Sequence, residues 1–256
     1  MAVNTLAYDL TGPPDAPVVM FGGSLGTTRA MWQPQLDGLA GDFRVLRFDH
    51  LGHGESPEPP GPYDIALLGT SVIGLLDALE LDTVGYTGLS IGGMVGQWLA
   101  AHHPDRIARL ALLCTAAHLP PEPWFERAKA VRAGGTAGIT DTVVSRWFTP
   151  AFAAEHPQFV ERFKAMLRSA PREGYASCCE AIAGMDLRPV LGRITAPTLV
   201  VSAAEDLSIP AHHGQAIAEA VPGATFTVLP DAAHIASAQQ PDAVNELLRT
   251  HFSTPV

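Results

Sequence analysis

The sequence contains little that would suit a membrane, a secretory route or a nucleic acid. It has no uninterrupted run of the roughly 18 apolar residues that a membrane span requires. Its segment Met1 to Leu10 lacks the basic start and the apolar stretch of a secretory signal. The 16 Lys and Arg residues are outnumbered by 26 Asp and Glu residues, and no Lys/Arg-rich run could contact phosphates. We therefore expect neither a membrane nor a nucleic acid as a partner.

Cysteine is also scarce. The thiols Cys114, Cys178 and Cys179 are odd in number and two of them are adjacent, which favours reduced thiols in a cytoplasmic protein over a disulfide framework. Ten histidines are present, yet no spacing of Cys and His matches a structural zinc site. The sequence therefore predicts no metal site.

Apolar side chains, in contrast, are abundant. Hydrophobic residues make up 47% of the chain and charged residues 16%, which predicts a well-packed globular protein. Short apolar runs alternate with segments of helical periodicity, and the expected strands cover 17–21, 44–48, 83–88, 110–114, 198–202 and 225–229. This alternation predicts an α/β fold, with a mostly parallel central sheet flanked by helices on both faces.

The stretch 118–188 interrupts this alternation. It has helical patches at 125–132, 139–148, 159–167 and 174–184, no clear strand, and prolines near both ends. We expect a helical cap (118–188) inserted into a core that comprises 1–117 and 189–256. Such an insertion is expected over the carboxyl-terminal edge of the sheet, where open α/β sheets bind ligands.

The motif with the clearest chemistry is the pentapeptide GLSIG at Gly88–Gly92. It fits the pattern G-x-S-x-G between an expected strand and an expected helix, which is typical of the nucleophile turn of α/β hydrolases. The chain can bend sharply there only if the residues two before and two after the serine are small, and Gly88, Gly92 and Gly93 meet this need. The motif predicts Ser90 as a nucleophile at the amino-terminal end of a helix.

A serine hydroxyl needs an adjacent base, and in this fold an acid and then a histidine follow the nucleophile along the chain. Asp206 lies just past the expected strand 198–202, and His234 lies in the loop after the last strand. We therefore predict a triad of Ser90, His234 and Asp206. The alternatives for the acid are Glu205 and Asp231. The alternatives for the base are four other histidines, namely His50, His53, His212 and His213.

An attacked carbonyl also needs two backbone N–H groups to hold the oxyanion that forms. Ile91, the residue after the nucleophile, is expected to supply one of them. The other is expected from the glycine-rich loop after the strand 17–21, with Ser24 favoured and its neighbour Leu25 as the alternative.

The sequence resembles the 3-oxoadipate enol-lactonases, a group of α/β hydrolases, over nearly the whole chain. Core segments at 23–28, 31–32, 48–56 and 87–96 carry this resemblance, together with cap segments at 131–135, 146–150, 174–179 and 185–188. Because a cap determines substrate choice, likeness in the cap bears on function more than likeness in the sheet. The run 235–240 departs from the family, which tends to have an Asn and a Glu after the histidine.

The resemblance implies an α/β-hydrolase fold and hydrolysis of a small anionic lactone, 3-oxoadipate enol-lactone, to 3-oxoadipate without a cofactor. Arg146 is the expected ligand of the substrate carboxylate, because a guanidinium grips a carboxylate with two hydrogen bonds. Trp124 and Trp147 are the expected walls of the pocket. The same triad would also suit another carboxylesterase, another lactonase or a C–C bond hydrolase, and a ligand-binding receptor could share the scaffold. The sequence leaves open whether the chain forms a homo-oligomer.

Overall fold

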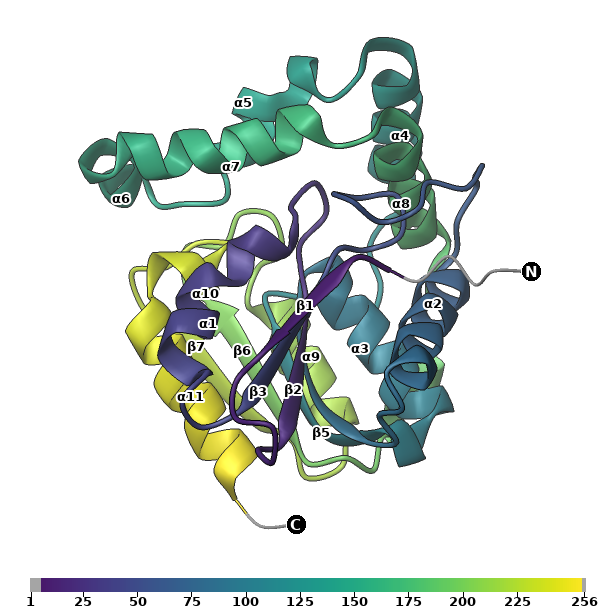
Figure 1. Cartoon of the computed structure of the whole chain (residues 1–256). Coiled ribbons are helices and arrows are strands. Elements are labelled where there is room, and N and C mark those ends of the chain that lie inside the picture. Colours follow the sequence, from purple (N-terminus) through teal and green to yellow (C-terminus); the bar gives the residue numbers. More distant parts are fainter. Residues whose placement is uncertain (1–5, 255–256) are drawn as a thin grey trace.

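A computed structural model describes residues 6–254, and a seven-stranded sheet forms its centre (Figure 1). The strand order is β1-β3-β2-β4-β5-β6-β7, in which β1 pairs antiparallel with β3 and all other neighbours are parallel. The strands are β1 (Tyr8–Thr11), β2 (Val18–Gly22), β3 (Arg44–Phe48), β4 (Val84–Leu89), β5 (Ile107–Leu113), β6 (Thr198–Ala203) and β7 (Thr225–Leu229). The predicted mostly parallel sheet is confirmed.

Helices cover both faces of this sheet. Figure 1 shows α1, α10 and α11 on one side of the sheet, and α2 and α3 on the other, while α9 packs on β6 and β7. These helices are α1 (Gln33–Leu39), α2 (Ile65–Ala78), α3 (Ile91–His102), α9 (His212–Ala220), α10 (Ala236–Gln239) and α11 (Pro241–Ser253). Short 3-10 turns are η1 (Arg29–Trp32), η2 (Pro104–Arg106), η3 (Ala137–Ile139) and η4 (Arg188–Arg193). Across residues 6–254, no helix is both long enough and apolar enough to cross a membrane.

Burial on both faces explains why the central strands are largely apolar. Every residue of β4 and of β6 is buried, whereas the edge strands β1 and β7 are partly exposed. A strand covered on both sides cannot alternate polar with apolar residues without leaving polar groups in the core. The carboxyl ends of β2, β4, β5 and β6 therefore meet at one well-packed edge, on which a site can be held rigidly.

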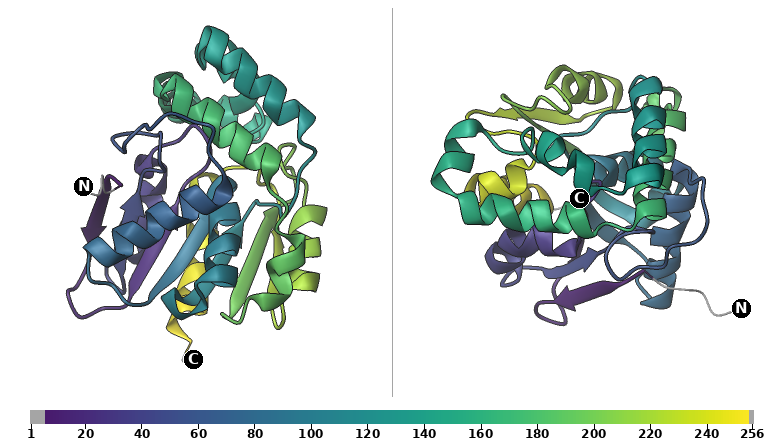
Figure 2. Two further views of the ribbon diagram at one scale, coloured as in Figure 1. Left: turned by 90° about the vertical axis from the view of Figure 1, so that its right-hand side faces the viewer. Right: turned by 90° about the horizontal axis from the view of Figure 1, so that it is seen from above.

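The cap is a helical insertion between β5 and β6, and it lies over the carboxyl ends of the parallel strands (Figures 1 and 2). Its helices are α4 (Glu122–Gly134), α5 (Thr140–Val144), α6 (Pro150–Glu155), α7 (Pro157–Ser169) and α8 (Arg172–Gly184). Helices α4 and α8 pack against each other, and Arg132 of α4 forms ion pairs with Glu173 and Glu180 of α8. Helices α5, α6 and α7 form an arm that extends away from α4 and α8 across the top of the core in Figure 1.

The chain enters and leaves the cap at neighbouring positions. His118 and Asp186 form an isolated antiparallel bridge, and the Leu187 N–H donates to the Ala117 carbonyl at 2.8 Å. The insertion of helices is as predicted. The division into a core of 1–117 and 189–256 and a cap of 118–188 stays a prediction. The bridge between His118 and Asp186 lies close to the two predicted boundaries of the cap.

Candidate active site

Ser90 occupies a sharp turn between β4 and α3. Its backbone has φ 58° and ψ −119°, a left-handed conformation that costs energy for a residue with a Cβ and that clusters at functional sites. The Ser90 N–H donates to the Leu113 carbonyl at 3.0 Å, which anchors the turn to the end of β5. A Cβ at position 88 would lie 2.2 Å from the Gly92 carbonyl oxygen. The glycines of the motif are therefore required by contact between backbone segments.

Gly92→Ala tests this turn, because a Cβ at position 92 would lie 2.1 Å from the Gly22 carbonyl oxygen. A strand carbonyl cannot rotate away, so we expect overpacking to lower the free energy of unfolding by about 3 kcal/mol. In a chain of this size such a loss lowers Tm by about 6–12 °C in a thermal melt. Gly41→Ala is the control, since nothing lies within 4 Å of its added Cβ. Equal melting temperatures for the two variants would contradict the tight turn.

His234 and Asp206 form a buried hydrogen-bonded pair. His234 Nδ1 and Asp206 Oδ2 are 2.8 Å apart, and both residues are about 3% exposed. The other carboxylate oxygen, Oδ1, accepts from the N–H groups of Ser208 at 2.8 Å and Ile209 at 2.9 Å. Three donors thus fix the position of the carboxylate and direct it at the imidazole. Such an arrangement fixes the tautomer with the proton on Nδ1 and leaves Nε2 free to act as a base.

The alternative acids and bases lie in other environments. Glu205 and Asp231 are exposed, and neither side chain contacts His234 in a recorded interaction within residues 6–254. His212 is exposed and His213 is half-buried, both at the start of α9, outside the cavity described below. The geometry favours Asp206 over both other carboxylates as the partner of the histidine.

His50 and His53 brace the glycine-rich loop after β2. His50 Nε2 donates to the Gly23 carbonyl at 3.1 Å, and His53 Nε2 accepts from the Gly26 N–H at 3.0 Å. Burial lowers the pKa of His50 to about 3, and burial also lowers the pKa of His53. Both rings are therefore neutral at ordinary pH, and the Nε2 atom of each is engaged in holding this loop.

The same loop bears on the choice of oxyanion donor. The Ser24 N–H already donates to the Met31 sulfur at 3.2 Å. Among the described residues, neither the Leu25 N–H nor the Ile91 N–H has a hydrogen-bond acceptor. The Gly92 N–H donates to the Gly23 carbonyl at 3.1 Å and thereby holds this loop against α3. A donor for an oxyanion must be free, so the geometry favours Leu25, the alternative in the sequence-based prediction, over Ser24.

A cavity of about 100 Å³ lies between the cap and the carboxyl ends of the strands. This volume is below the several hundred Å³ of a typical drug-sized site, so it suits a small ligand. Its lining brings together the predicted residues Ser24, Leu25, Ser90, Trp124, Arg146, Trp147 and His234. It also contains residues that the sequence reasoning missed, namely Arg127, Thr142, Val143, Tyr175, Ser208 and Ile209. Among the residues that the structure describes, no acidic one lines this cavity.

Arg127 is the most informative of the missed residues. Its guanidinium lies 4.7 Å from the centre of the Trp124 ring, as expected for positions three apart on one helix. Within residues 6–254 neither Arg127 nor Arg146 forms an ion pair with a carboxylate, whereas Arg132 of the same helix pairs with two. The i, i+3 spacing to Trp124 was the sequence signal that could have identified Arg127.

Tyr175 adds a polar group to the cavity wall. It is fully buried, and its hydroxyl has no hydrogen-bond partner of normal geometry among the described residues. Burial raises the pKa of Tyr175, and the nearby Arg127 guanidinium opposes that shift only in part. The neutral hydroxyl is available to a polar ligand. A positively charged cavity beside a serine and a histidine can bind an anionic acyl compound and attack its carbonyl.

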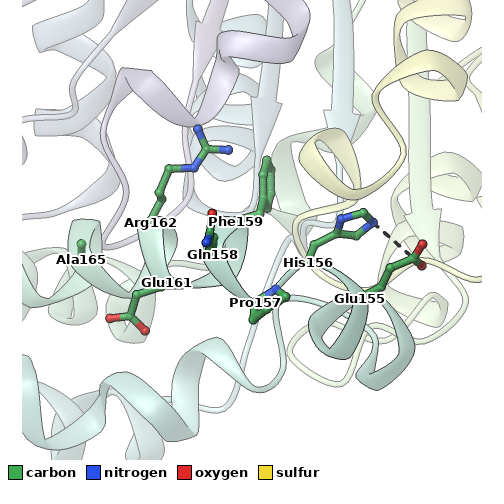
Figure 3. A pocket seen from close by; sticks show the side chains of 8 residues that line it. All are labelled: Glu155, His156, Pro157, Gln158, Phe159, Glu161, Arg162 and Ala165. Atoms are coloured by element: carbon green, nitrogen blue, oxygen red, sulfur yellow. Dashed lines mark ion pairs between the residues drawn. The ribbon is translucent and has the colours of Figure 1, made fainter.

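A larger hollow of about 970 Å³ lies on the cap arm, lined by Glu155 to Phe159 and by Glu161, Arg162 and Ala165 (Figure 3). Its titratable pair, His156 Nε2 and Glu155 Oε2, is 3.9 Å apart and exposed. None of the predicted catalytic residues lines this hollow. Within residues 6–254 no group of three His, Cys, Asp or Glu side chains has an arrangement that could hold a metal ion.

Comparisons with known proteins agree with this fold and show the family. The family model described as the alpha/beta hydrolase fold matches residues 16–241. The chain is 42% identical over 241 residues to 3-oxoadipate enol-lactonase 2 of Acinetobacter baylyi, covering 94% of this chain and 90% of that protein. It is 32% identical to enol-lactonase 1 of the same organism, covering 93% and 90%. The crystal structure of the enol-lactonase from Burkholderia xenovorans LB400 superposes with a TM-score of 0.95 at 40% identity, covering 97% of this chain and 96% of that one.

Proposed function

Because this chain belongs to the α/β-hydrolase family and is an enol-lactonase-like hydrolase, we propose that it hydrolyses 3-oxoadipate enol-lactone to 3-oxoadipate. The resemblance to enol-lactonases that the motifs indicated is confirmed at the level of the family. The observation that carries the substrate proposal is the cavity. It combines Ser90 and His234 with two arginines that form no ion pair, and none of its lining residues within 6–254 is acidic.

The proposed chemistry begins with the tautomer that Asp206 selects. With its Nδ1–H donated to Asp206, His234 takes the Ser90 proton on Nε2 as the Ser90 oxygen attacks the lactone carbonyl. The N–H groups of Ile91 and Leu25 hold the developing oxyanion. Ile91 is the first residue of α3, so the positive end of the helix dipole adds to this stabilisation.

Ring opening then releases an enol that stays attached to the acyl group. The imidazolium of His234 donates its proton to the leaving enol oxygen, and the enol tautomerises to a ketone, which makes ring opening effectively irreversible. His234 next removes a proton from water, whose oxygen attacks the acyl carbon and frees Ser90. These steps use only side chains and backbone of this chain and one water molecule.

The cap supplies recognition of the substrate carboxylate in this proposal. Arg127 and Arg146 reach the cavity from α4 and from the turn after α5, and Trp124 and Trp147 form its walls. A carboxylate placed between two guanidiniums compensates charges that form no ion pair with a carboxylate in the described part of the chain. Because the formal net charge is −10, this local positive region also attracts an anion against the overall field.

Arg127→Ala and Arg146→Ala test the substrate class. Each is expected to raise KM for the enol-lactone by about 10- to 100-fold, since a charge-assisted hydrogen bond contributes about 1.5–3 kcal/mol. The kcat/KM for a neutral ester of similar size is expected to change by less than about 3-fold, because the triad is intact. The measurement follows the ultraviolet loss of the lactone beside a panel of esters for each variant.

Arg162→Ala is the control, because this cap arginine stacks on Phe159 and lies outside the cavity. A wild-type enzyme that turns over neutral esters far better than the lactone would favour a general carboxylesterase. Equal losses on charged and neutral substrates in the Arg127 and Arg146 variants would assign both arginines to the packing of the cap. A folded wild type that fails to react with a fluorophosphonate at Ser90 would favour a binding protein on the same scaffold.

A further inference from the structure

Tyr175 carries a buried hydroxyl that the proposed chemistry does not use. The residue lies on α8, is fully buried, and lines the cavity that contains Ser90 and His234. Within residues 6–254 its hydroxyl has no hydrogen-bond partner of normal geometry, and a buried hydroxyl without a partner costs free energy. An unpaired polar group in this place indicates that a ligand completes its hydrogen bonding.

The backbone around Tyr175 holds the phenol in a fixed place. The preceding residue, Gly174, donates its N–H to Glu58 Oε1 at 2.9 Å. A Cβ at position 174 would lie 2.0 Å from the Gly52 carbonyl oxygen, so no side chain fits between the two backbones. The first turn of α8 is thus fixed on the core, and the phenol that it carries is a preorganised hydrogen-bond donor.

Tyr175 lies between the glycine-rich loop after β2 and Arg127. On the side of the loop, a Cβ added at Gly26 would lie 3.0 Å from Cε2 of the Tyr175 ring. On the other side, the Arg127 guanidinium is close enough to act on the hydroxyl. Burial raises the pKa of Tyr175, and this positive charge opposes the shift in part. The phenol therefore extends from the loop that supplies an oxyanion donor toward the arginine proposed to bind the carboxylate.

The ring oxygen of the proposed substrate has the same neighbours. On one side it is bonded to the carbonyl carbon that Ser90 attacks, and on the other to the carbon that bears the carboxymethyl arm. With the carbonyl at the oxyanion donors and the carboxylate at Arg127, the ring oxygen lies between the two, as Tyr175 does. The ring oxygen is also the atom that leaves when the lactone opens.

We propose that Tyr175 is a catalytic residue whose hydroxyl donates a hydrogen bond to the leaving oxygen of the lactone. This inference rests on the proposed function, because it assumes a lactone bound with its carboxylate at Arg127. After Ser90 has added to the carbonyl, the bond between the acyl carbon and the ring oxygen breaks, and its electron pair stays on that oxygen. Tyr175 stabilises the enolate that forms and keeps its own proton, while His234 protonates the oxygen.

This hydrogen bond is stronger once the ring has begun to open. The ring oxygen of a lactone is uncharged, whereas an enolate oxygen is charged and accepts hydrogen bonds that are roughly twice as strong. The bond therefore stabilises the transition state more than the bound substrate, and its loss should lower kcat and leave KM nearly unchanged. Loss of Arg127, in contrast, is expected to raise KM.

Tyr175→Phe tests the proposal, because it removes the hydroxyl and keeps the ring against the loop. We expect kcat for the enol-lactone to fall by about 10- to 100-fold, as for loss of one hydrogen bond to a charged oxygen, with KM within about 3-fold of wild type. An unchanged kcat with a raised KM would assign the hydroxyl to the carboxylate and overturn the inference.

Tyr63→Phe is the matched control. Tyr63 is also buried, but its hydroxyl donates to the Pro59 carbonyl at 2.7 Å, and the residue does not line the cavity. Its kcat should stay within about 2-fold of wild type, and loss of its hydrogen bond should lower Tm by about 2–4 °C. Tyr175→Phe should keep or raise Tm, because it removes a buried hydroxyl without a partner. A folded Tyr175→Phe that melts below wild type and loses activity equally on every substrate would assign the hydroxyl to the structure and overturn the inference.

Two neutral esters separate a role at the leaving oxygen from a role elsewhere in the site. Isopropenyl acetate and p-nitrophenyl acetate transfer the same acetyl group to Ser90, but the leaving oxygen is an enol in the first and a much weaker base in the second. For Tyr175→Phe we expect kcat/KM to fall by about 10-fold or more on the enol ester and by less than about 3-fold on the nitrophenyl ester. Equal losses on both esters would place the hydroxyl at the oxyanion or at His234 and overturn the inference.

The ester comparison also keeps this test independent of the substrate proposal, because neither ester carries a carboxylate. A wild type that hydrolyses isopropenyl acetate but ignores the enol-lactone would overturn the proposed substrate alone. A wild type that hydrolyses the lactone, with a Tyr175→Phe variant that matches it on the lactone and on both esters, would overturn the role of Tyr175 alone.

Discussion

Replacing Ser90 or His234 with alanine is expected to lower kcat for the enol-lactone by a factor on the order of 10⁴ or more. Ser90→Ala removes the only atom proposed to form the acyl-enzyme. His234→Ala leaves the serine without a base and the leaving enol without an acid. Both losses should appear in kcat with KM little changed, because neither side chain is proposed to bind the carboxylate.

The structure supplies a matched control for this experiment. His212→Ala removes an exposed histidine at the start of α9, outside the cavity, and is expected to leave kcat within about 2-fold of wild type. The double variant Ser90→Ala/His234→Ala should be about as inactive as either single variant, since the two residues act as a unit. Retention of most activity by a folded Ser90→Ala or His234→Ala would remove the proposed triad.

Asp206→Asn is expected to lower kcat by about 10⁴, as the equivalent change does in a serine protease triad. The asparagine oxygen can still accept from the Ser208 and Ile209 N–H groups, so the loop should keep its shape. The asparagine NH₂ would then face His234 Nδ1, where a carboxylate oxygen now accepts at 2.8 Å. The imidazole would turn its lone pair toward the amide and carry its proton on Nε2, where it cannot accept the Ser90 proton.

Glu205→Gln is the control for this change, because it is the same kind of substitution at the neighbouring, exposed carboxylate. Its kcat is expected to stay near the wild-type value. Comparable activity of Asp206→Asn and wild type, measured on folded protein, would show that another group orients His234. A large loss in Glu205→Gln together with an active Asp206→Asn would transfer the role to Glu205.

Most of the core could be predicted because its constraints are local. The six predicted strands all occur, since a strand buried on both faces reads as an apolar run whatever it pairs with. The missed strand, Tyr8–Thr11, is a four-residue antiparallel edge strand whose burial pattern does not alternate. Only its pairing with β3 identifies it as a strand, and the sequence does not show that pairing.

The cap was predicted less well in detail. A helix was expected over 139–148, but α5 ends at Val144. The chain then turns so that the Trp147 carbonyl can accept from Ile235, and α6 follows at Pro150–Glu155, where no helix was predicted. Helix ends in an insertion depend on what the insertion packs against, and periodicity carries no information about that partner.

By itself, the sequence determined the fold class, the turn at Ser90 and the identity of its proposed partners Asp206 and His234. The turn needs glycine at fixed offsets, and the chain order of nucleophile, acid and base is a property of the fold. Both features can therefore be recognised in the amino-acid sequence alone. Tertiary structure alone decided the preference for Leu25 over Ser24 and the entry of Arg127 into the cavity. Each of these depends on which donor or charge is left free or engaged after distant segments meet, and spacing along the chain does not specify that.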